Sequence, residues 1–563
     1  MRDRRPERHA VLDANALASL LHVTDERERA AADAPSVQAA VRNHPLLVLG
    51  ALVAVLASVW ILGTPRSGGP DEPSHVVRGG ALVRGQLDGE PFPRFDFQDS
   101  FELPGYVGFP DPVCFAFDEF APASCTNALE PADGDVEAGT RAASYPIWGH
   151  LPGGLGTFAP ADWSAWAARL AHAVIPVGLV VGALALVRRR GAMGTGPVLL
   201  ALTPMAWFMF AVVNPSGIVI GGGIGLWAAL TTRPHTGRFA GWLAAAAWAA
   251  MVLPRRDGMV WASLIVAIVV LTDTTPVRDW WRMLGRAPAV LVAVSALATL
   301  AWAARSDTNA ATMLFVAPFA PVAAWAVRQG WDRLRGTSAP ARFAYPLVLV
   351  GLAGVAGLLV MAQRDAGFKR RALELTIMRT GDDLNEAIGV LGWLDTPVPT
   401  TAVFAWLVGL GLLAGLSVAA GRWDILGRGG LVLVVAIFSS WVLTMLQNDA
   451  TGTYWQGRYY LPLLVGLPIL LSAVELPAAA GRRMGASCAA VGLGVANAAL
   501  YAAMRRWGVG NAGSFSPWDW DTYETPLPPV ALLAIHLAAS VGLVGWVLSQ
   551  HDHQSASRVL DDR

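Results

Sequence analysis

Residues 63–75 read GTPRSGGPDEPSH and directly follow the first long apolar run of the chain. Three prolines and three glycines surround the adjacent acids Asp71 and Glu72, which predicts a stiff turn at the end of a membrane helix. A carboxylate held there can accept a proton from a hydroxyl, and His75 and Arg78, one turn further on, can hold an anion. The alternative interpretation is a Pro/Gly turn that simply ends the helix.

The composition is that of a polytopic membrane protein. Of 563 residues, 54% are hydrophobic and 15% are charged, and 23 are tryptophan. The formal net charge is zero, and Lys369 is the only lysine, so the chain has no basic field of the kind that binds nucleic acid. Cys114 and Cys125 share a polar segment, Cys488 lies in an apolar run, and the three do not have the spacing of a zinc site.

Apolar runs of spanning length predict an all-α bundle of about fourteen transmembrane helices. Pro and Gly interrupt the chain in two regions, 196–231 and 238–273, and the number of spans depends most on these. The predicted spans are 45–63, 166–187, 196–213, 216–231, 238–253, 258–273, 287–304, 310–328, 343–361, 400–420, 429–446, 458–475, 485–503 and 528–548.

Arginines in the short loops predict the topology, because cytoplasmic loops are enriched in Lys and Arg. With the N-terminus inside, every short inner loop is basic and both termini are cytoplasmic. Arg255-Arg256 and residues 369–371 break this rule by lying on the outer face. Such exceptions are either tolerated noise or sites that need a cation, and we favour the second interpretation. The predicted organisation is a partly disordered cytoplasmic extension (1–44), a transmembrane domain (45–550) with three outer segments (64–165, 362–399 and 504–527), and a cytoplasmic tail (551–563).

The first outer segment, residues 64–165, is too polar to cross a membrane and too long to be a simple link. We expect a small folded extracytoplasmic cap. A disulfide between Cys114 and Cys125 is favoured over two free thiols, because the outer compartment is oxidising. Tyr145 belongs to an aromatic cluster before the second span, which either anchors the chain at the interface or stacks on a sugar or lipid.

The second outer segment, residues 362–399, has the pattern of an amphipathic helix lying on the membrane surface. Arg458 stands beside Tyr459 at the outer end of an apolar run, where an arginine is costly unless it has a partner. It either serves a site or reaches out to lipid phosphate. The last outer segment, 504–527, could close over a site or lie at the interface.

Taken in order, these landmarks resemble a family of bacterial multipass membrane proteins that is classed as a domain of unknown function and grouped by fold with the GT-C glycosyltransferases. The resemblance extends from residue 45 to about residue 475. It is carried by PDEPSH (70–75) with Arg78, Tyr145-Pro146, Arg169, GWLDTP (392–397), and GRY (457–459) with Pro462.

The resemblance implies a GT-C-like fold in the bacterial plasma membrane with an extracytoplasmic active site. The GT-C superfamily transfers a sugar from a polyprenyl phosphate donor, here to a glycan or lipid acceptor of the cell envelope, and an acid in the first outer loop acts as base or metal ligand. That role falls on Asp71 or Glu72, and the resemblance does not say which. In an inverting transfer, cations would stabilise the leaving phosphate. The candidate donor-phosphate and substrate residues are His75, Arg78, Tyr145, Lys369, Arg370, Trp393, Asp395, Arg458 and Tyr459.

No cofactor is predicted to be required, and no residue is assigned as a metal ligand, because two adjacent acids and one histidine are a thin ligand set. Mg or Mn could still bind if water and donor phosphate completed the coordination.

Two other functions compete with the transferase. A transporter or flippase of a lipid-linked glycan would place its binding groups near the middle of the bilayer and would commonly show internal repeats. We find no clear repeat. A non-catalytic scaffold for envelope assembly would need neither Asp71 nor Glu72.

Overall fold

A computed structural model of the chain describes the residues from 44 to 550 with several gaps. The chain divides into two units, residues 1–51 and 52–563, and apart from the first turns of α3 everything below lies in the second. The predicted N-terminal extension, the span at 343–361 and the C-terminal tail lie outside the described residues. Those described are 44–92, 99–108, 113–128, 133–232, 237–273, 275, 277–304, 317–334, 366–447, 455–520, 523 and 525–550, with backbone alone for 277–278, 331–334, 366–369, 372 and 444–447.

The structure is mostly helical. Within the described ranges, seven helices are long and apolar enough to cross a membrane, which requires about 20 apolar residues. Each of them overlaps one of the predicted spans. They are α3 (Pro45–Gly63), α6 (Ala161–Val187), α13 (Arg286–Ala303), α18 (Thr400–Ala419), α19 (Trp423–Gln447), α22 (Ala478–Val509) and α23 (Pro529–Leu548).

The structure does not show the fourteen predicted spans. The run at 196–213 forms α7 (Ala192–Ala201) and α8 (Pro204–Phe210), which are bent by 75° and count at most as an eighth span. Other predicted spans form helices too short to cross in a straight line. These are α9 (Pro215–Thr231), α10 (Arg238–Val252), α11 (Gly258–Thr272), and α20 (Leu461–Leu464) followed by α21 (Gly466–Leu471).

Burial explains why short apolar helices resemble spans in the sequence. Every residue of α9 from Pro215 to Leu230 is buried, and α9 packs against α6, α10 and α11. A helix that is apolar all round is buried, but protein can cover it as well as lipid.

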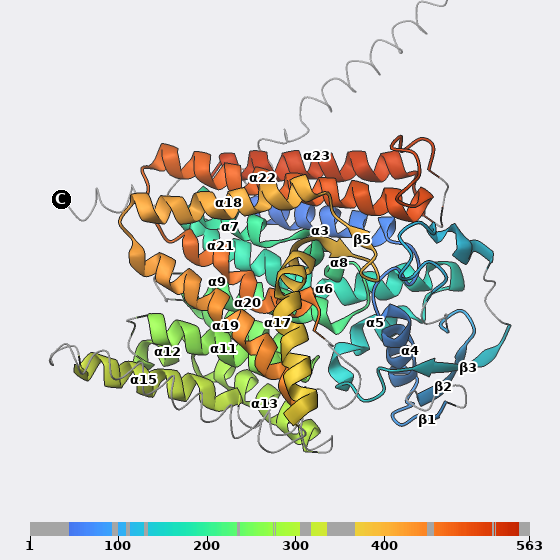
Figure 1. The fold of residues 1–563 in the computed structure, drawn as a ribbon, viewed down its shortest axis with the longest axis horizontal. Helices are drawn as coiled ribbons and strands as arrows, with labels where there is room; N and C mark the ends of the chain where they lie inside the picture. The colour runs from blue at the N-terminus through green and yellow to red at the C-terminus, as the bar shows by residue number, and fades with distance from the viewer. Residues whose placement is uncertain are drawn as a thin grey trace, which may run out of the picture. The chain divides into compact units, whose positions relative to one another are not determined.

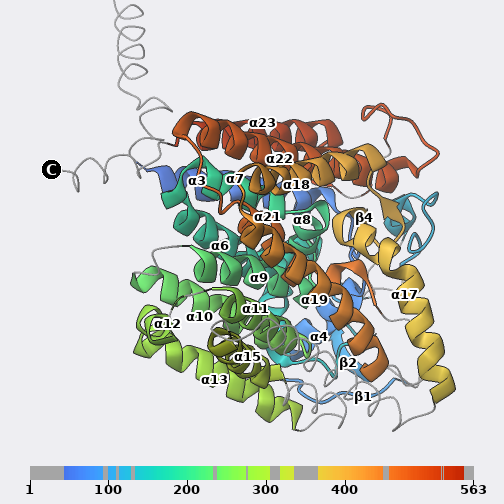
Figure 2. The same cartoon turned by 60° about the vertical axis from the view of Figure 1, so that its left-hand side comes forward.

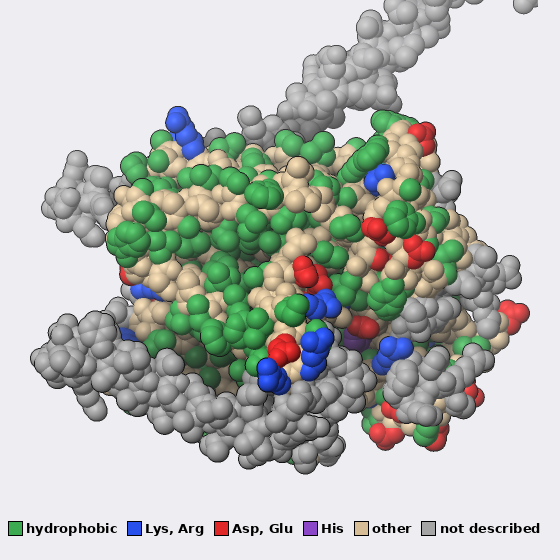
Figure 3. Space-filling view, in the orientation of Figure 1, with side chains coloured by type: hydrophobic (Ala, Val, Ile, Leu, Met, Phe, Trp, Pro, Cys, Tyr) green, Lys and Arg blue, Asp and Glu red, His purple; other side chains and the backbone are tan. Residues whose placement is uncertain are grey.

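Figures 1 and 2 show α18, α22 and α23 side by side, with α7 packed against α22. Hydrophobic side chains cover this face of the molecule, whereas charged side chains gather over α17 and over part of the segment between α3 and α6 (Figure 3). The remaining elements of this helical part are α12 (Val277–Leu284), η4 (Ala317–Phe319), α15 (Ala320–Leu334), α17 (Ala366–Gly389) and η5 (Gly457–Tyr459). The helix expected in the second outer segment is thus present as α17.

The segment between α3 and α6, residues 64–160, forms a small folded region that we call the cap. Its three strands, β1 (Glu90–Pro91), β2 (Asp99–Pro104) and β3 (Asp135–Thr140), make an antiparallel sheet in that order. Helix α4 (Glu72–Val83) packs on the sheet through Val77 and Ala81. A disulfide joins Cys114 to Cys125, with Cα atoms 6.3 Å apart. The other elements of the cap are η1 (Ala123–Ala128), η2 (Ile147–Gly149) and α5 (Leu151–Gly156).

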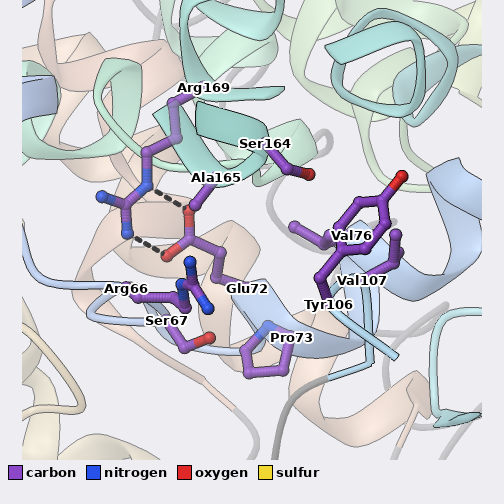
Figure 4. Close-up of a pocket in the computed structure, with 10 residues that line it drawn as sticks. All are labelled: Arg66, Ser67, Glu72, Pro73, Val76, Tyr106, Val107, Ser164, Ala165 and Arg169. Atoms are coloured by element: carbon purple, nitrogen blue, oxygen red, sulfur yellow. Dashed lines mark hydrogen bonds and ion pairs between the residues drawn. The ribbon is translucent and has the colours of Figure 1, made fainter. Parts of the chain in front are cut away.

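A buried ion pair fixes the start of the cap. Arg169 on α6 donates from Nε and Nη2 to the two carboxylate oxygens of Glu72, both at 2.7 Å, and both side chains are almost fully buried. Figure 4 shows the two side chains facing each other beside a small pocket. The backbone N–H groups of Gly69 and Val213 also donate to Glu72, at 3.2 and 3.0 Å.

Arg169 also binds the end of α3. Its guanidinium donates to the carbonyl oxygens of Thr64 and Pro65, both at 2.6 Å, and more weakly to that of Ile61. The last carbonyls of a helix have no partner within the helix, and a cation there also interacts favourably with the helix dipole. Glu72 and Arg169 therefore tie the end of α3, the start of α4, α6 and the α8–α9 link together.

Removal of the disulfide tests the cap. Replacing both Cys114 and Cys125 by Ser releases a closed loop of about 11 residues, so we expect a loss of about 2–4 kcal/mol and faster proteolysis of the cap. Thermal unfolding and limited proteolysis in detergent would measure this. The single Cys114→Ser variant should behave like the double variant, and unchanged proteolysis of both would contradict the prediction.

Glu72→Gln tests the ion pair. The substitution leaves the Arg169 charge buried and uncompensated, so we expect destabilisation of about 3–5 kcal/mol, measured by thermal unfolding in detergent. The neighbouring Asp71→Asn variant is the matched control. Its carboxylate is nearly half exposed, so water can partly compensate the charge left on Arg458, and we expect a smaller loss than for Glu72→Gln. Equal losses in the two variants would show that Glu72 has no special structural role.

Candidate functional site

Asp71 immediately precedes α4 in an unusual backbone conformation. Its φ of 60° lies in the left-handed region, which is unfavourable for most residues but tolerated by Asp and Asn. Asn214, which caps α9, donates from Nδ2 to the carbonyl of Pro70 at 3.0 Å and so holds the turn in place. The turn presents the Asp71 carboxylate with 46% of its side chain exposed.

Arg458 reaches this carboxylate from the far end of the chain. Its Nη2 lies 3.0 Å from Oδ2 of Asp71, and it also donates to the hydroxyl of Tyr459 at 3.4 Å. The Arg458 side chain is only 2% exposed, and its Nε is buried without a hydrogen-bond partner among the described residues. A buried guanidinium with an unused donor, next to a half-exposed carboxylate, can accept a further anionic ligand.

Glycine at position 457 allows this placement. A Cβ on Gly457 would lie 2.2 Å from the backbone nitrogen of Ala387, so only glycine fits where η5 meets α17. The Gly457 N–H donates to Glu386 of α17 at 3.0 Å. The GRY motif therefore combines a close backbone contact, the cation Arg458 and the ring of Tyr459.

A second cation, Arg255, lies in the link between α10 and α11. Its guanidinium carbon is 4.7 Å from the centre of the Tyr459 ring and 5.9 Å from that of Tyr145. It is held by Asp257 at 2.8 Å and by the hydroxyl of Ser216 at 2.7 Å. Burial alone would raise the pKa of Asp257, but the Arg255 guanidinium lowers it below its ordinary value, so the pair is ionised.

Arg255 is absent from the site residues proposed from the sequence. The signal that could have identified it was its basic pair, Arg255-Arg256, which breaks the charge rule for the loops. We call Asp71, Arg255, Arg458, Tyr145 and Tyr459 the acid–arginine cluster.

His75 lies one turn after Asp71 on α4 and adjoins the cluster. Its ring is edge-on to Tyr145, with centroids 5.6 Å apart, and its Nδ1 lies 3.0 Å from Nε2 of His150. Burial lowers the pKa of His75 well below its ordinary value, and the nearby charges of Arg255 and Arg458 lower it further. His75 is therefore neutral and does not supply a charge for phosphate.

Two basic candidates with described side chains, Arg78 and Arg370, show no contact with the cluster. Arg78 points into the cap, where it donates to the carbonyl of Leu87 at 2.9 Å and lies 5.4 Å from the Phe101 ring centre. Arg370 is exposed on α17 and pairs with Glu374 at 3.0 Å. Lys369 also belongs to α17, and its side chain lies outside the described part.

Trp393 and Asp395 are used in packing the chain. Trp393 donates from Nε1 to the carbonyl of Ser67 at 3.0 Å. Both oxygens of Asp395 are occupied, by Thr396 and the Trp393 backbone on one side and by Arg506 of α22 on the other. Both residues lie in the turn between β4 (Val390–Leu391) and β5 (Thr396–Pro397). Asp395 connects this turn to α22, and Trp393 connects it to the segment after α3.

The cluster does not have the donor set of a divalent-cation site. Asp71 is the only carboxylate of the cluster, and the neighbouring Asp257 is paired with Arg255. Glu72 is fully engaged by Arg169 and two backbone N–H groups. Across the residues that the structure describes, no group of three or more His, Cys, Asp or Glu side chains could hold a metal ion.

Comparison with known proteins places the chain in a family. No curated protein sequence matches it. Among solved structures, it is similar to the archaeal oligosaccharyltransferase AglB from Archaeoglobus fulgidus, in complex with an inhibitory peptide and a dolichol-phosphate, at 13% sequence identity and a TM-score of 0.39. The match covers 91% of this chain and 56% of AglB, so the chain spans little more than half the length of that protein.

The family model described as "Predicted membrane protein (DUF2142)" matches residues 54–328 and 383–467. These ranges make up more than half of the chain and include every member of the acid–arginine cluster. The chain is an integral multipass membrane protein and belongs to the DUF2142 family.

Proposed function

We propose that the chain is an inverting GT-C type glycosyltransferase that moves a sugar from a polyprenyl phosphate donor to a glycan or lipid acceptor on the outer face of the bacterial plasma membrane. The observation that carries the proposal is the contact between Asp71 and Arg458, 387 residues apart in the sequence and 3.0 Å apart in the structure. It joins a half-exposed carboxylate to a buried guanidinium, the two kinds of group that an inverting transfer needs.

In the proposed reaction, an acceptor hydroxyl oxygen attacks the anomeric carbon while Asp71 takes its proton. A bond forms between that oxygen and the anomeric carbon, and the bond from the carbon to the phosphate oxygen breaks. The electron pair leaves with polyprenyl phosphate. Arg458 and Arg255 would stabilise the charge on the leaving phosphate, since guanidinium groups bind phosphate in a bidentate manner.

The two adjacent acids have different roles in this proposal. Glu72 accepts four hydrogen bonds, from Arg169, Gly69 and Val213, and is buried. It has no accessible oxygen for a substrate. Asp71 keeps one oxygen without a described partner and is open to solvent. We therefore assign the base to Asp71, with no step through a metal.

The rival functions make different demands on Asp71. A scaffold does not need its charge. A flippase would move lipid-linked glycan without forming a glycosidic bond, so a covalent product separates it from a transferase.

Asp71→Asn tests the proposed base. Asn tolerates the left-handed conformation and keeps the shape of the side chain, so the substitution removes the charge and the basic oxygen without a change of size. Because a general base contributes about 10²–10⁴-fold, we expect transfer to fall by at least about 100-fold in membranes supplied with polyprenyl phosphate sugars. The readout is chromatography of the glycosylated product.

Asp279→Asn is the matched control, because Asp279 is a partly exposed acid on α12 that pairs with Arg282 and not with a member of the cluster. Its transfer rate should equal that of the wild type. Full transfer by Asp71→Asn would refute the catalytic role, and absence of transfer by the wild type with every polyprenyl phosphate sugar would refute the proposed function.

A further inference from the structure

A close crossing of two cap helices brings His75 and His150 together. Helices α4 and α5 touch at Gly79 and Gly154, where a Cβ on Gly154 would lie 2.2 Å from the carbonyl oxygen of Gly79. Each histidine lies four residues before one of these glycines, hence one helical turn away. The two rings therefore meet, with centroids 5.1 Å apart and a nitrogen–nitrogen distance of 3.0 Å.

A backbone carbonyl sets the protonation of the His150 ring. Its Nδ1 lies 3.1 Å from the carbonyl oxygen of Pro146. A carbonyl oxygen only accepts hydrogen bonds, so Nδ1 of His150 carries a proton. Burial lowers the pKa of His150 to about 3, and the ring is neutral at physiological pH. Its Nε2 therefore has a lone pair and acts as an acceptor.

The tautomer of His75 follows from that of His150. Because Nε2 of His150 accepts, Nδ1 of His75 must donate across the 3.0 Å contact. A neutral imidazole carries one proton, so Nε2 of His75 has the lone pair. Among the described residues, the hydrogen bond of the His75 ring is the one that Nδ1 makes with His150, and none involves Nε2.

The surroundings of His75 favour the neutral form. Arg255 and Arg458 approach from the α10–α11 link and from η5, and His172 approaches from α6. Asp71, which caps α4, is one turn away, and its carbonyl accepts the His75 N–H at 3.1 Å. The Tyr145 ring covers one side. His75 thus offers an acceptor atom beside a base and two cations.

We propose that Nε2 of His75 accepts a hydrogen bond from a hydroxyl group of the sugar acceptor, and that His150 is a positioning residue that fixes this tautomer. This inference rests on the proposed function and deepens it. It adds a contact to the acceptor beside Asp71, and it removes His75 from the groups that hold donor phosphate. The acceptor is then a hydroxyl-bearing sugar or lipid headgroup that gives one hydrogen bond to a neutral imidazole.

Nitrogen-15 NMR of the full-length protein labelled at histidine tests the tautomer without any activity assay. We expect neutral signals for both residues between pH 5 and 8, each with a protonated Nδ1 and an unprotonated Nε2. His75→Asn and His150→Asn assign the signals by loss. An imidazolium at position 75 within this range, or a proton on its Nε2, would overturn the proposal.

Two substitutions of His75 test the contact with the acceptor. Gln can place its amide oxygen near the position of Nε2, whereas Lys offers only a charge. We expect His75→Gln to raise the KM for acceptor by about fivefold, the effect of one weakened neutral hydrogen bond, with kcat little changed. His75→Lys should abolish transfer, because an ammonium group cannot accept a hydrogen bond. If His75→Lys retained transfer and His75→Gln lost transfer, a cation would be needed at this position, and the proposal would be overturned.

A matched pair at position 150 tests the positioning role. His150→Gln keeps an amide oxygen that can accept from His75, whereas His150→Leu does not. At equal thermal stability, His150→Gln should retain a larger share of wild-type transfer than His150→Leu. In the NMR spectrum, His150→Leu should lose the single defined tautomer of His75. Equal activity and an unchanged spectrum for Leu would overturn the role of His150. If the wild type catalyses no transfer, the proposed function fails, while the NMR spectra still decide the tautomer.

Discussion

The bidentate ion pair between Glu72 and Arg169 is the interaction on which the rest of the site depends. It is buried, and it satisfies Glu72, Arg169 and the carbonyls of Thr64 and Pro65 directly after α3 together. Burying two charges is expensive and is offset only when the geometry is good and the remaining hydrogen bonds are made. Here they are made, and as a result the turn before α4 has a fixed position relative to α6. The left-handed conformation of Asp71 persists because the residues on either side of it are held.

Adjacent acids with opposite environments follow from this arrangement. Glu72 turns inward and is saturated, while Asp71 turns outward and meets Arg458. The sequence does not distinguish the carboxylates of Asp71 and Glu72. The prolines and glycines around them predict a turn, but they do not predict which of the two side chains faces the protein interior. Glu72 faces inward because it pairs with Arg169, a single arginine within an apolar helix. The sequence did not reveal this partner.

The sequence predicted the positions of the helices better than their number. The span predicted at residues 45–63 coincides with α3, and the cap, its disulfide and α17 lie within the predicted segments. The number of spans could not be predicted, because apolar composition is the same whether lipid or protein covers a helix, as α9 illustrates. The sequence likewise did not show that Asp395 and Trp393 serve packing, because their partners Arg506 and Ser67 are remote in the chain. Charge patterning did point to Arg255, although only as an exception to a rule.

In the proposed reaction, the pairing of Asp71 with Arg458 couples the movement of the proton to the movement of charge. Before transfer, Arg458 is balanced by Asp71 and Arg255 by Asp257. A sugar phosphodiester brings one negative charge, and the departing polyprenyl phosphate gains a second. Asp71 becomes neutral when it takes the proton of the acceptor, and its hold on Arg458 weakens at that moment. The Arg458 guanidinium can then pair with the phosphate as the negative charge on the phosphate increases. One ion pair is exchanged for another, and the total charge of the cluster and its substrates is unchanged. A neutral His75 is compatible with this exchange, because a third cation would compete for both the carboxylate and the phosphate.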